Sequence, residues 1–413
     1  MAKDTTAGVR SAASVHEAID AAHHELWKRF IDPQGIMYDY AGLDGHVVLP
    51  TPEECQQGKP NALGWWTTIE NGAFFCGLYL DALCNRWRVS HGDDTKAEAR
   101  KVVAGLLLLS RIGKTPGFIG RGVAADGQSH YAIGSDDQTL PWLYGLWRYV
   151  HSGIPTADER TAIIKQMVVV MTAVKQAGWC MPSDDGYGVR GGWRGEDARE
   201  APRLLFAARA MYDMTNDAAW LADYRKLASE MLPKTGKTRV ELCAQGMTFR
   251  VDDDNILWTS ASSQAALHAL VEMETDTSLQ AQYRKGLLAN ATNALPAIAK
   301  YARLHEQSQA TFSPDWRPLN AFWQPQTTVN DAVQVAMKEV PTWSSTISPR
   351  RMEENAGMRE PLFACWTVAL CDDEALLATA RPQIDAALTS YRWNTLYTSA
   401  FFAAECTYYA LQR

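Results

Sequence analysis

The sequence predicts an all-α protein, built as an (α/α)6 toroid of six helical hairpins. Three observations support this prediction: apolar residues recur with helical spacing, capping motifs mark helix starts, and the connections alternate between short and long. The 413 residues, 46% of them hydrophobic, supply enough apolar side chains for a large core. We expect residues 1–413 to form a single toroid domain.

Helix starts are visible as capping boxes, in which a hydroxyl and a carboxylate three residues apart satisfy each other's backbone amides. Ser14, Thr95 and Thr156 each begin such a motif, and Phe74 and Leu78 illustrate the four-residue apolar steps that follow. Twelve helices are predicted from these patterns. They cover residues 14–31, 67–88, 95–111, 138–152, 157–177, 198–215, 218–231, 259–273, 277–301, 357–371, 374–390 and 395–411.

Short turns follow the second helix of each pair, as at residues 152–155 and 216–217, whereas most links within pairs are long. Helices that alternate in this way suit six hairpins closed into a ring, with the even-numbered helices inside. The even-numbered helices are rich in small apolar residues, as in 201–210, and this composition permits close packing. An α-solenoid is the structural alternative, but it does not require the long loops to gather on one face.

The long loops precede the inner helices and therefore open on the same end of the predicted ring. Long loops inside compact domains are usually functional, and helix N-termini add amide donors and partial positive charge. We expect the functional site at this end. The loops lie near residues 32–66, 112–137, 178–197, 232–258 and 302–356, with a short one at 391–394.

Composition excludes several classes of function. Forty Lys and Arg oppose 47 Asp and Glu, for a net charge of −7, and no basic run suggests nucleic acid or an anionic membrane surface as a partner. Phosphate-loop, dinucleotide-binding and metal-binding motifs are missing from the sequence, so we expect no cofactor and no metal, with a calcium ion bound in a loop left open as an alternative. The eight Cys suit reduced core positions. Without a long apolar run, we expect a soluble cytoplasmic protein, or a periplasmic one if an export signal has been removed.

Adjacent carboxylates open the inner helix near residue 138, after a segment rich in glycine and polar residues. Repulsion between Asp136 and Asp137 is expected to raise the pKa of one of them toward the range of a general acid. The alternative is that one of the two, or Ser135, caps the helix. His130 and Tyr131 are candidate base and acid, or else hydrogen-bonded loop residues.

Glu70 begins another inner helix, just after Trp66 and among apolar neighbours. A carboxylate buried in such surroundings is costly unless it is paired or used, so Glu70 is either catalytic or a partner for amides or an arginine. The third loop, residues 187–197, combines glycines with Trp193, Arg194 and Glu196. Its arginines suit recognition of a carboxylate, although a network that pins the loop explains them equally well.

Tryptophan is concentrated in or near the long loops, where ten of the 15 lie. Flat rings with one polar edge suit the apolar faces of sugars, although loop aromatics also form small cores of their own. These tryptophans are at positions 65, 66, 142, 179, 193, 258, 316, 323, 343 and 393. Polar partners for sugar hydroxyls are offered by the fifth loop, in Asn320, Gln324, Gln326, Asn330, Arg350, Arg351, Glu353, Glu354 and Asn355.

The arrangement resembles the α/α-toroid carbohydrate-active enzymes, a grouping with unsaturated-glucuronyl hydrolases, other uronate-acting glycosidases, sugar epimerases and polysaccharide lyases. Residues 121–149 are similar to bacterial toroid proteins, from Arg121-Gly122-Val123 to the segment that ends at Tyr149. In the hydrolases an Asp at the mouth of an inner helix is the acid/base, which the resemblance assigns to Asp137, with Asp136 second. The chain departs from their Trp-Arg-Gly-Asn-Gly-Trp signature, since Gly195 is followed by Glu196 where Asn is expected.

The predicted function is a glycoside hydrolase for a small acidic, uronate-containing oligosaccharide, with Asp137 as general acid or acid/base and Glu70 or Asp136 as the second carboxylate. The resemblance to the lyases implies an alternative, in which Arg121 neutralises the uronate and His130 or Tyr131 removes a proton. A non-catalytic carbohydrate-binding toroid and a sugar epimerase are further alternatives, and the oligomeric state is left open. Seven residues are expected to bind substrate, namely Arg121, Gln138, Trp142, Trp193, Arg194, Glu196 and Trp66.

Overall fold

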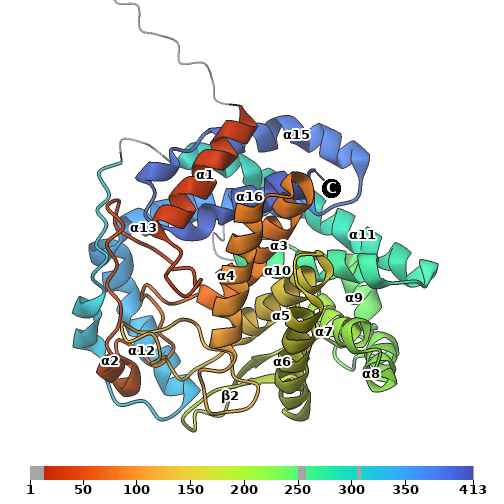
Figure 1. Ribbon diagram of the computed structural model, residues 1–413, viewed down its shortest axis with the longest axis horizontal. Helices are drawn as coiled ribbons and strands as arrows, with labels where there is room; N and C mark the ends of the chain where they lie inside the picture. The colour runs from red at the N-terminus through yellow and green to blue at the C-terminus, as the bar shows by residue number, and fades with distance from the viewer. Residues whose placement is uncertain (1–13, 250–256, 305–307, 413) are drawn as a thin grey trace, which may run out of the picture.

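The chain folds mainly into α-helices. The computed structural model describes residues 14–249, 257–304 and 308–412 (Figure 1). Within these ranges, regular strands are confined to β1 (Cys180–Pro182) and β2 (Val189–Gly192), which pair antiparallel. The all-α class predicted from the sequence is confirmed.

Each of the twelve predicted helices corresponds to a helix of the structure, and most ends agree within a few residues. The two largest differences are seven residues each. The last helix starts at Phe402 because Trp393–Thr395 and Ser399–Phe401 form 3-10 turns first, and the ninth ends at Ala294 because Leu295–Arg303 is 3-10. The twelve are α1 (Val15–Arg29), α3 (Gly72–Ser90), α4 (Asp93–Leu109), α5 (Asp136–His151), α6 (Ala157–Gln176), α7 (Glu200–Thr215), α8 (Ala218–Ser229), α10 (Leu257–Met273), α11 (Thr277–Ala294), α14 (Glu360–Ala369), α15 (Glu374–Thr389) and α16 (Phe402–Ala410).

Two of the three predicted capping boxes are confirmed. The hydroxyls of Ser14 and Thr156 accept from the backbone amide three residues on, and the glutamate there accepts in return. The predicted start at Thr95 is wrong, because α4 begins at Asp93 and Thr95 is buried in its first turn. Two acidic residues then lie at the positive end of the helix dipole, which suits a helix start equally well.

The fifth long loop, expected to lack regular structure over residues 302–356, contains α12 (Val329–Thr342) and α13 (Pro349–Glu354). A capping box between Thr328 and Asp331 starts α12, and its buried residues Ala332, Val335, Ala336 and Glu339 recur with helical spacing, so the prediction missed a helical pattern that the sequence contains. The other short elements are α2 (Pro52–Gln57), α9 (Arg239–Gln245), 3-10 segments Leu295–Arg303 and Arg317–Phe322, and π-helical turns Trp343–Ile347 and Asn355–Arg359.

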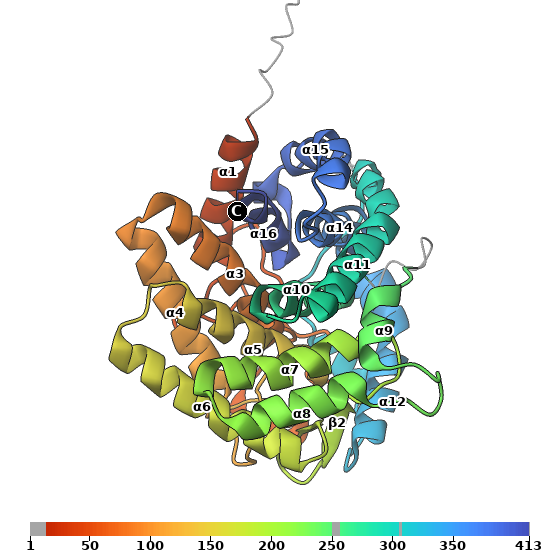
Figure 2. The ribbon, with the colours of Figure 1, turned by 90° about the vertical axis from the view of Figure 1, so that its right-hand side faces the viewer.

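Six helices pack against one another in sequence. Helix α3 contacts α5 and α16, α10 contacts α7 and α14, α5 meets α7, and α14 meets α16. Helices α3 and α10 are buried on nearly every side, whereas α4, α8 and α11 bury one face each. Figure 2 shows α8 alongside α7 and α11 alongside α10, as their contacts require. We call α3, α5, α7, α10, α14 and α16 the inner helices.

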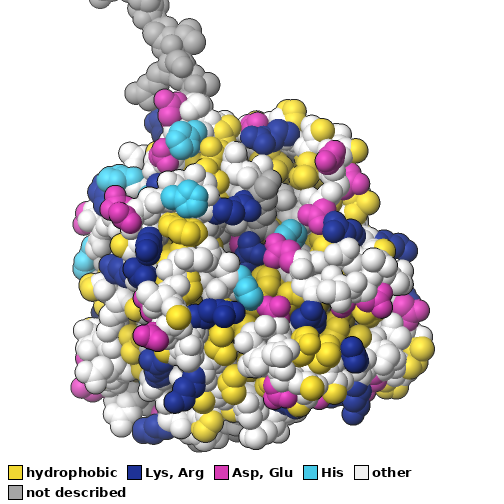
Figure 3. All heavy atoms as spheres, turned by 45° about the vertical axis from the view of Figure 1, so that its right-hand side comes forward, with side chains coloured by type: hydrophobic (Ala, Val, Ile, Leu, Met, Phe, Trp, Pro, Cys, Tyr) yellow, Lys and Arg dark blue, Asp and Glu magenta, His cyan; other side chains and the backbone are white. Residues whose placement is uncertain are grey.

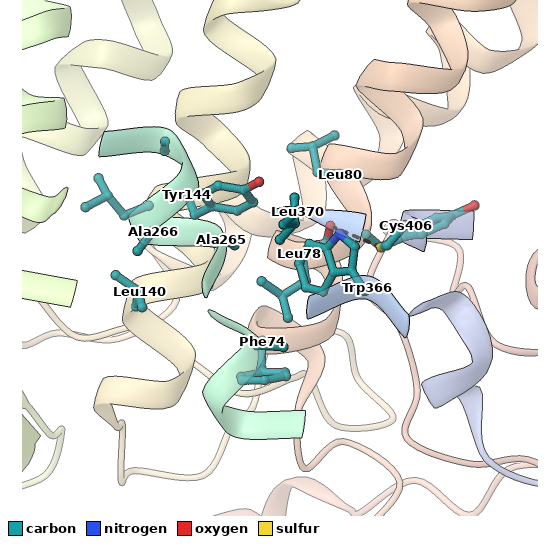
Figure 4. Close-up of a cluster of buried hydrophobic side chains, with 14 of the residues drawn as sticks. Phe74, Leu78, Leu80, Leu140, Tyr144, Ala265, Ala266, Trp366, Leu370 and Cys406 are labelled. Atoms are coloured by element: carbon teal, nitrogen blue, oxygen red, sulfur yellow. Dashed lines mark hydrogen bonds between the residues drawn. The ribbon is translucent and has the colours of Figure 1, made fainter. Parts of the chain in front are cut away.

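The core between the inner helices is apolar and closely packed. Figure 4 shows Phe74 and Leu78 of α3 near Tyr144 of α5 and Trp366 of α14. The backbones of α3 and α5 touch at Gly77 and Gly145, where an added Cβ would collide with backbone atoms of the facing helix. Only glycine permits this approach.

The surface is mixed in charge. Lys and Arg side chains alternate with Asp and Glu over the face shown in Figure 3, in keeping with the moderate net charge of −7. Among the described helices, none is both long enough and apolar enough to cross a bilayer.

A buried ionic cluster joins α1 to α3, α4 and α16. His23 lies 3.0 Å from carboxylate oxygens of both Glu98 and Glu405, and its Nδ1 is 3.2 Å from the hydroxyl of Tyr79. Burial opposes the charged imidazole, but the charges and hydrogen bonds of Glu405 and Glu98 outweigh burial and raise the pKa of His23 from 6.5 to about 9. Arg86 also lies 3.5 Å from Glu405.

Replacing His23 with Gln should lower the free energy of unfolding at neutral or lower pH. Since the pKa of His23 is 6.5 unfolded and about 9 folded, its stabilisation is complete below pH 6.5 and is lost as the pH rises through about 9. We expect a pH-dependent contribution of about 2–3 kcal/mol. Denaturant unfolding of both proteins between pH 6 and 10 measures it. His24→Gln, an exposed neighbour on the same helix, is the control. The same pH dependence in both variants would contradict the assignment.

Candidate functional site

The N-terminal ends of the inner helices are joined by polar contacts. Gln138 of α5 accepts from the amide of Phe74 in α3 and donates to Asn71 just before it. Glu360 of α14 accepts from the amide of Leu257 in α10, 3.2 Å away. These contacts join the start of α3 to that of α5, and the start of α10 to that of α14. The candidate residues predicted from the sequence lie at or near such helix starts.

Arg203 completes these connections and is fully buried. This α7 side chain donates to Asp136 at 3.1 Å, to the carbonyl of Thr259 at 2.9 Å and to Ser263 at 2.8 Å. It thereby holds the starts of α5, α7 and α10 together. Burying a cation is tolerated because its hydrogen bonds and the nearby carboxylates replace water.

A cavity of about 360 Å³ opens at this end of the helices. Its volume lies within the range of about 300–1,000 Å³ that is typical of small-molecule sites. Aromatic rings from four different segments line it, together with two arginines and two carboxylates. The rings belong to Trp65, Trp66, Phe75, Trp258 and Trp343.

Asp39 and Glu70 are the two carboxylates of the cavity. Asp39 is 3% exposed, and its two oxygens accept from the backbone amide and side-chain amide of Asn71 at 2.6 and 2.7 Å. Burial first, and then the negative charge of Glu70, raise the pKa of Asp39 to about 8, although Arg351 opposes the shift. The protonated form of Asp39 is therefore favoured at neutral pH.

Glu70 was predicted from the sequence, whereas Asp39, in the first long loop between two tyrosines, was not. The backbone around it is fixed by distant partners: its amide donates to the carbonyl of Thr68, and its carbonyl accepts from Ser399. Glu70 is held by the backbone amide of Trp66, which donates to it at 2.9 Å. An isolated Asp without a motif gave no signal in the sequence beyond its position in the loop.

Two arginines lie beside these carboxylates. The Arg351 guanidinium is 4.2 Å from the ring of Tyr40 and 4.8 Å from that of Trp343, and it approaches Glu70 to 3.8 Å. Among the described residues, its Nε and Nη1 have no hydrogen-bond partner, so ring stacking holds this side chain. Arg359 lies over Trp258 and pairs with Glu360. Arg351 belongs to the fifth loop that was expected to supply polar groups.

Trp66 lines the cavity, as the sequence prediction requires of a substrate-binding residue. Its φ of 71° is a left-handed conformation, which is costly for a bulky side chain. The indole is fixed by a hydrogen bond to the carbonyl of Ala336 and by contact with Trp343, with ring centroids 4.4 Å apart. Surrounding contacts therefore hold a strained backbone in place at the cavity wall.

Asp136 and Asp137 form a second carboxylate pair, at the start of α5. Burial and then the charge of Asp137 raise the pKa of Asp136, against the opposing charge of Arg203. The side chain of Asp137 is 33% exposed and lies 3.4 Å from Arg203, so it is the more accessible of the two. Neither belongs to the residues that line the cavity around Asp39.

Arg190 of β2 lies between the two carboxylate pairs. Its guanidinium is 5.1 Å from the ring of Trp65, and the charges of Asp137, Asp136 and Glu70 all act on it. Burial nevertheless lowers the pKa of Arg190, and within the described ranges no carboxylate comes within ion-pair distance of it. Gly191, with a φ of +73°, allows the strand to lie directly against Asp136. The prediction placed arginines in this loop but chose Arg194.

Three predicted residues are bonded to protein groups and do not line the cavity. Arg121 is 3% exposed and donates to the carbonyls of Ile133 and Glu70 and to Ser135. Tyr131 is 1% exposed and donates to the carbonyl of Lys59. His130 lies 3.1 Å from Asp184. The structure does not bring this set to the cavity.

The remaining predicted substrate contacts also lie apart from it. Gln138 is buried in the helix connection described above. Trp142 and Trp193 are fully buried in the core, and the indole of Trp142 donates to Leu106. Arg194 is half exposed and lies 3.7 Å from Glu230, while Glu196 accepts from the amide of Lys234.

Comparison with known proteins gives no further assignment. No family model, curated protein or solved structure matches the chain. The resemblance to toroid enzymes therefore stays a prediction from the sequence. Within the described residues, no group of three or more His, Cys, Asp or Glu side chains is arranged to hold a metal ion.

Asp184 is expected to stabilise the loop before α5. Burial raises the pKa of Asp184, but hydrogen bonds from Thr115, Lys114 and His130 outweigh burial and lower it overall. Asp184→Asn should reduce the free energy of unfolding by about 2–3 kcal/mol, because an amide group would oppose backbone donors. Denaturant unfolding tests this expectation. The exposed neighbour provides a matched control, Asp185→Asn, for which a loss above about 0.5 kcal/mol would contradict the site-specific effect.

Proposed function

We propose that the protein is a glycoside hydrolase with an (α/α)6 toroid fold, acting on a small acidic, uronate-containing oligosaccharide. The order of contacts among the inner helices supports the toroid, since α16 returns to α3. The site at their N-terminal ends supports a carbohydrate ligand, because aromatic rings and charged groups share one cavity.

The observation that carries the proposal is the carboxylate pair at the base of this cavity. Hydrolysis of a glycosidic bond needs an acid that protonates the leaving oxygen. It also needs a second carboxylate, which either activates a water molecule or attacks the anomeric carbon of the sugar. Asp39, with its raised pKa, is the acid, and Glu70 is the base that activates water. Asn71 orients Asp39, and the Trp66 amide and Arg351 orient Glu70.

Arg190 and Asp137 bind the sugar in this proposal. Arg190 lies over Trp65 and has no ion-pair partner among the described residues. A uronate carboxylate would therefore pair with its guanidinium and neutralise its charge. The side chain of Asp137 is accessible, and its charge acts on Arg190. In this proposal Asp137 accepts hydrogen bonds from sugar hydroxyls. These roles replace the expected ones of Arg121 and Arg194.

Hydrolysis is favoured over the lyase alternative by the positions of the predicted elimination residues. A lyase needs a base and a cation beside the uronate, whereas none of His130, Tyr131 and Arg121 lines the cavity. A binding protein without activity would use the same cavity but release no product. The two alternatives are therefore separated by the products formed.

Incubation with saturated and unsaturated uronate oligosaccharides should yield new reducing ends without a gain in ultraviolet absorbance.

Glu70→Gln should lower kcat by about 10²–10⁴-fold because the base is lost. Asp137→Asn should mainly raise KM, by about tenfold. Glu53→Gln, at an exposed position of α2, is the control. Rising absorbance would identify a lyase, and loss of kcat in Asp137→Asn with normal turnover in Asp39→Asn would assign the acid to Asp137.

The pH dependence of kcat should follow the carboxylate pair. Because the acid must be protonated and the pKa of Asp39 is raised to about 8, kcat is expected to fall as the pH rises through about 8. In Asp39→Asn, the residual activity should no longer fall there. An alkaline limb that persists in this variant would exclude Asp39 as the acid.

A further inference from the structure

Methionine side chains form an exposed rim on the cavity. Met337 is 54% exposed and Met352 is 37% exposed, and both line the cavity that contains Asp39 and Glu70. Val340 lines it as well, one turn after Met337 on the same face of α12. We call Met337, Val340 and Met352 the apolar rim.

The rim is held by an anchored helix. Helix α12 packs through Ala332 and Ala336 against Leu63 and Ile133. Glu339 is fully buried and accepts from Asn61 at 2.8 Å, and the carbonyl of Ala336 accepts from Trp66. The apolar rim is therefore presented to the cavity by a helix that these contacts hold in place.

The cavity changes in character from base to rim. Its base offers two carboxylates and an arginine, which can bind the hydroxyls of a sugar ring. The rim offers thioether and aliphatic side chains, which do not suit a sugar hydroxyl. Exposed apolar side chains at a concave site usually mark a ligand surface, and methionine adapts well to ligands of varied shape. A glycoside held at the base would extend past the rim with the group beyond its scissile bond.

We propose that the apolar rim binds an apolar, preferably aromatic, aglycone, so that the uronate-containing substrate carries a hydrophobic group beyond its scissile bond. This inference rests on the proposed function, because it takes the sugar ring to lie at Asp39 and Glu70. It narrows the substrate class to hydrophobic glycosides. The aryl group would contact Met337 and Met352 and would leave as a phenol or alcohol, protonated by Asp39.

Steady-state kinetics test the inference with phenyl β-D-glucuronide and a disaccharide that has the same uronic acid ring. Wild-type protein should prefer the phenyl glycoside in kcat/KM. In Met337→Gln, and more strongly in the double variant with Met352→Gln, KM for the phenyl glycoside should rise by about five- to tenfold. KM for the disaccharide should change by less than about twofold. Met231→Gln, 62% exposed and away from the cavity, is the matched control.

Saturation-transfer NMR with phenyl β-D-glucuronide separates this inference from the proposed function. Strong saturation of the phenyl protons that is lost in the double variant supports the rim, even if no turnover is seen and the hydrolase proposal fails. Turnover without preference for the phenyl glycoside, or equal KM changes for both substrates, overturns the rim while the hydrolase stands. A smaller particle in the double variant by light scattering also overturns it, because the rim would then bind a second copy of the chain.

Discussion

The buried guanidinium of Arg203 determines how the ends of three inner helices meet. It extends from α7 to Asp136 at the start of α5 and to Thr259 and Ser263 at the start of α10. A cation without water needs all of these partners, because an unpaired buried charge costs several kcal/mol. The positions of the three helix starts, and of the loops that precede them, thus depend on one side chain.

Two buried carboxylates near the cavity come from different elements, yet burial shifts their pKa values in the same direction. Glu360 begins α14, and burial raises its pKa to about 7 although the charge of Arg359 opposes the shift. Asp39 comes from a loop and is buried beside Glu70, and its pKa is raised to about 8. Loss of water therefore favours the protonated form of both groups, even at a helix start, where the dipole acts in the opposite direction.

The sequence predicted the features that depend on local patterns. Capping boxes and apolar periodicity located the twelve long helices, and the position of Glu70 and Trp66 before an inner helix indicated the cavity. Features that depend on distant contacts were missed. Asp39 is fixed by Thr68 and Ser399, and nothing adjacent to it in the chain reports its burial. Trp142 and Trp193 show the converse, because proximity to a loop could not distinguish core tryptophans from those that line the cavity.

The contact between Gly77 and Gly145 has a consequence for how such a site changes in evolution. Gly77 follows Glu70 by seven residues, and Gly145 follows Asp137 by eight. Their contact fixes how closely α3 and α5 approach each other, because an added Cβ at either position would meet backbone atoms of the other helix. A larger residue there would push the two helices apart and would move Asp137 relative to Glu70. Two glycines in the core would thus be under selection for the relative positions of side chains at the N-terminal ends of their helices.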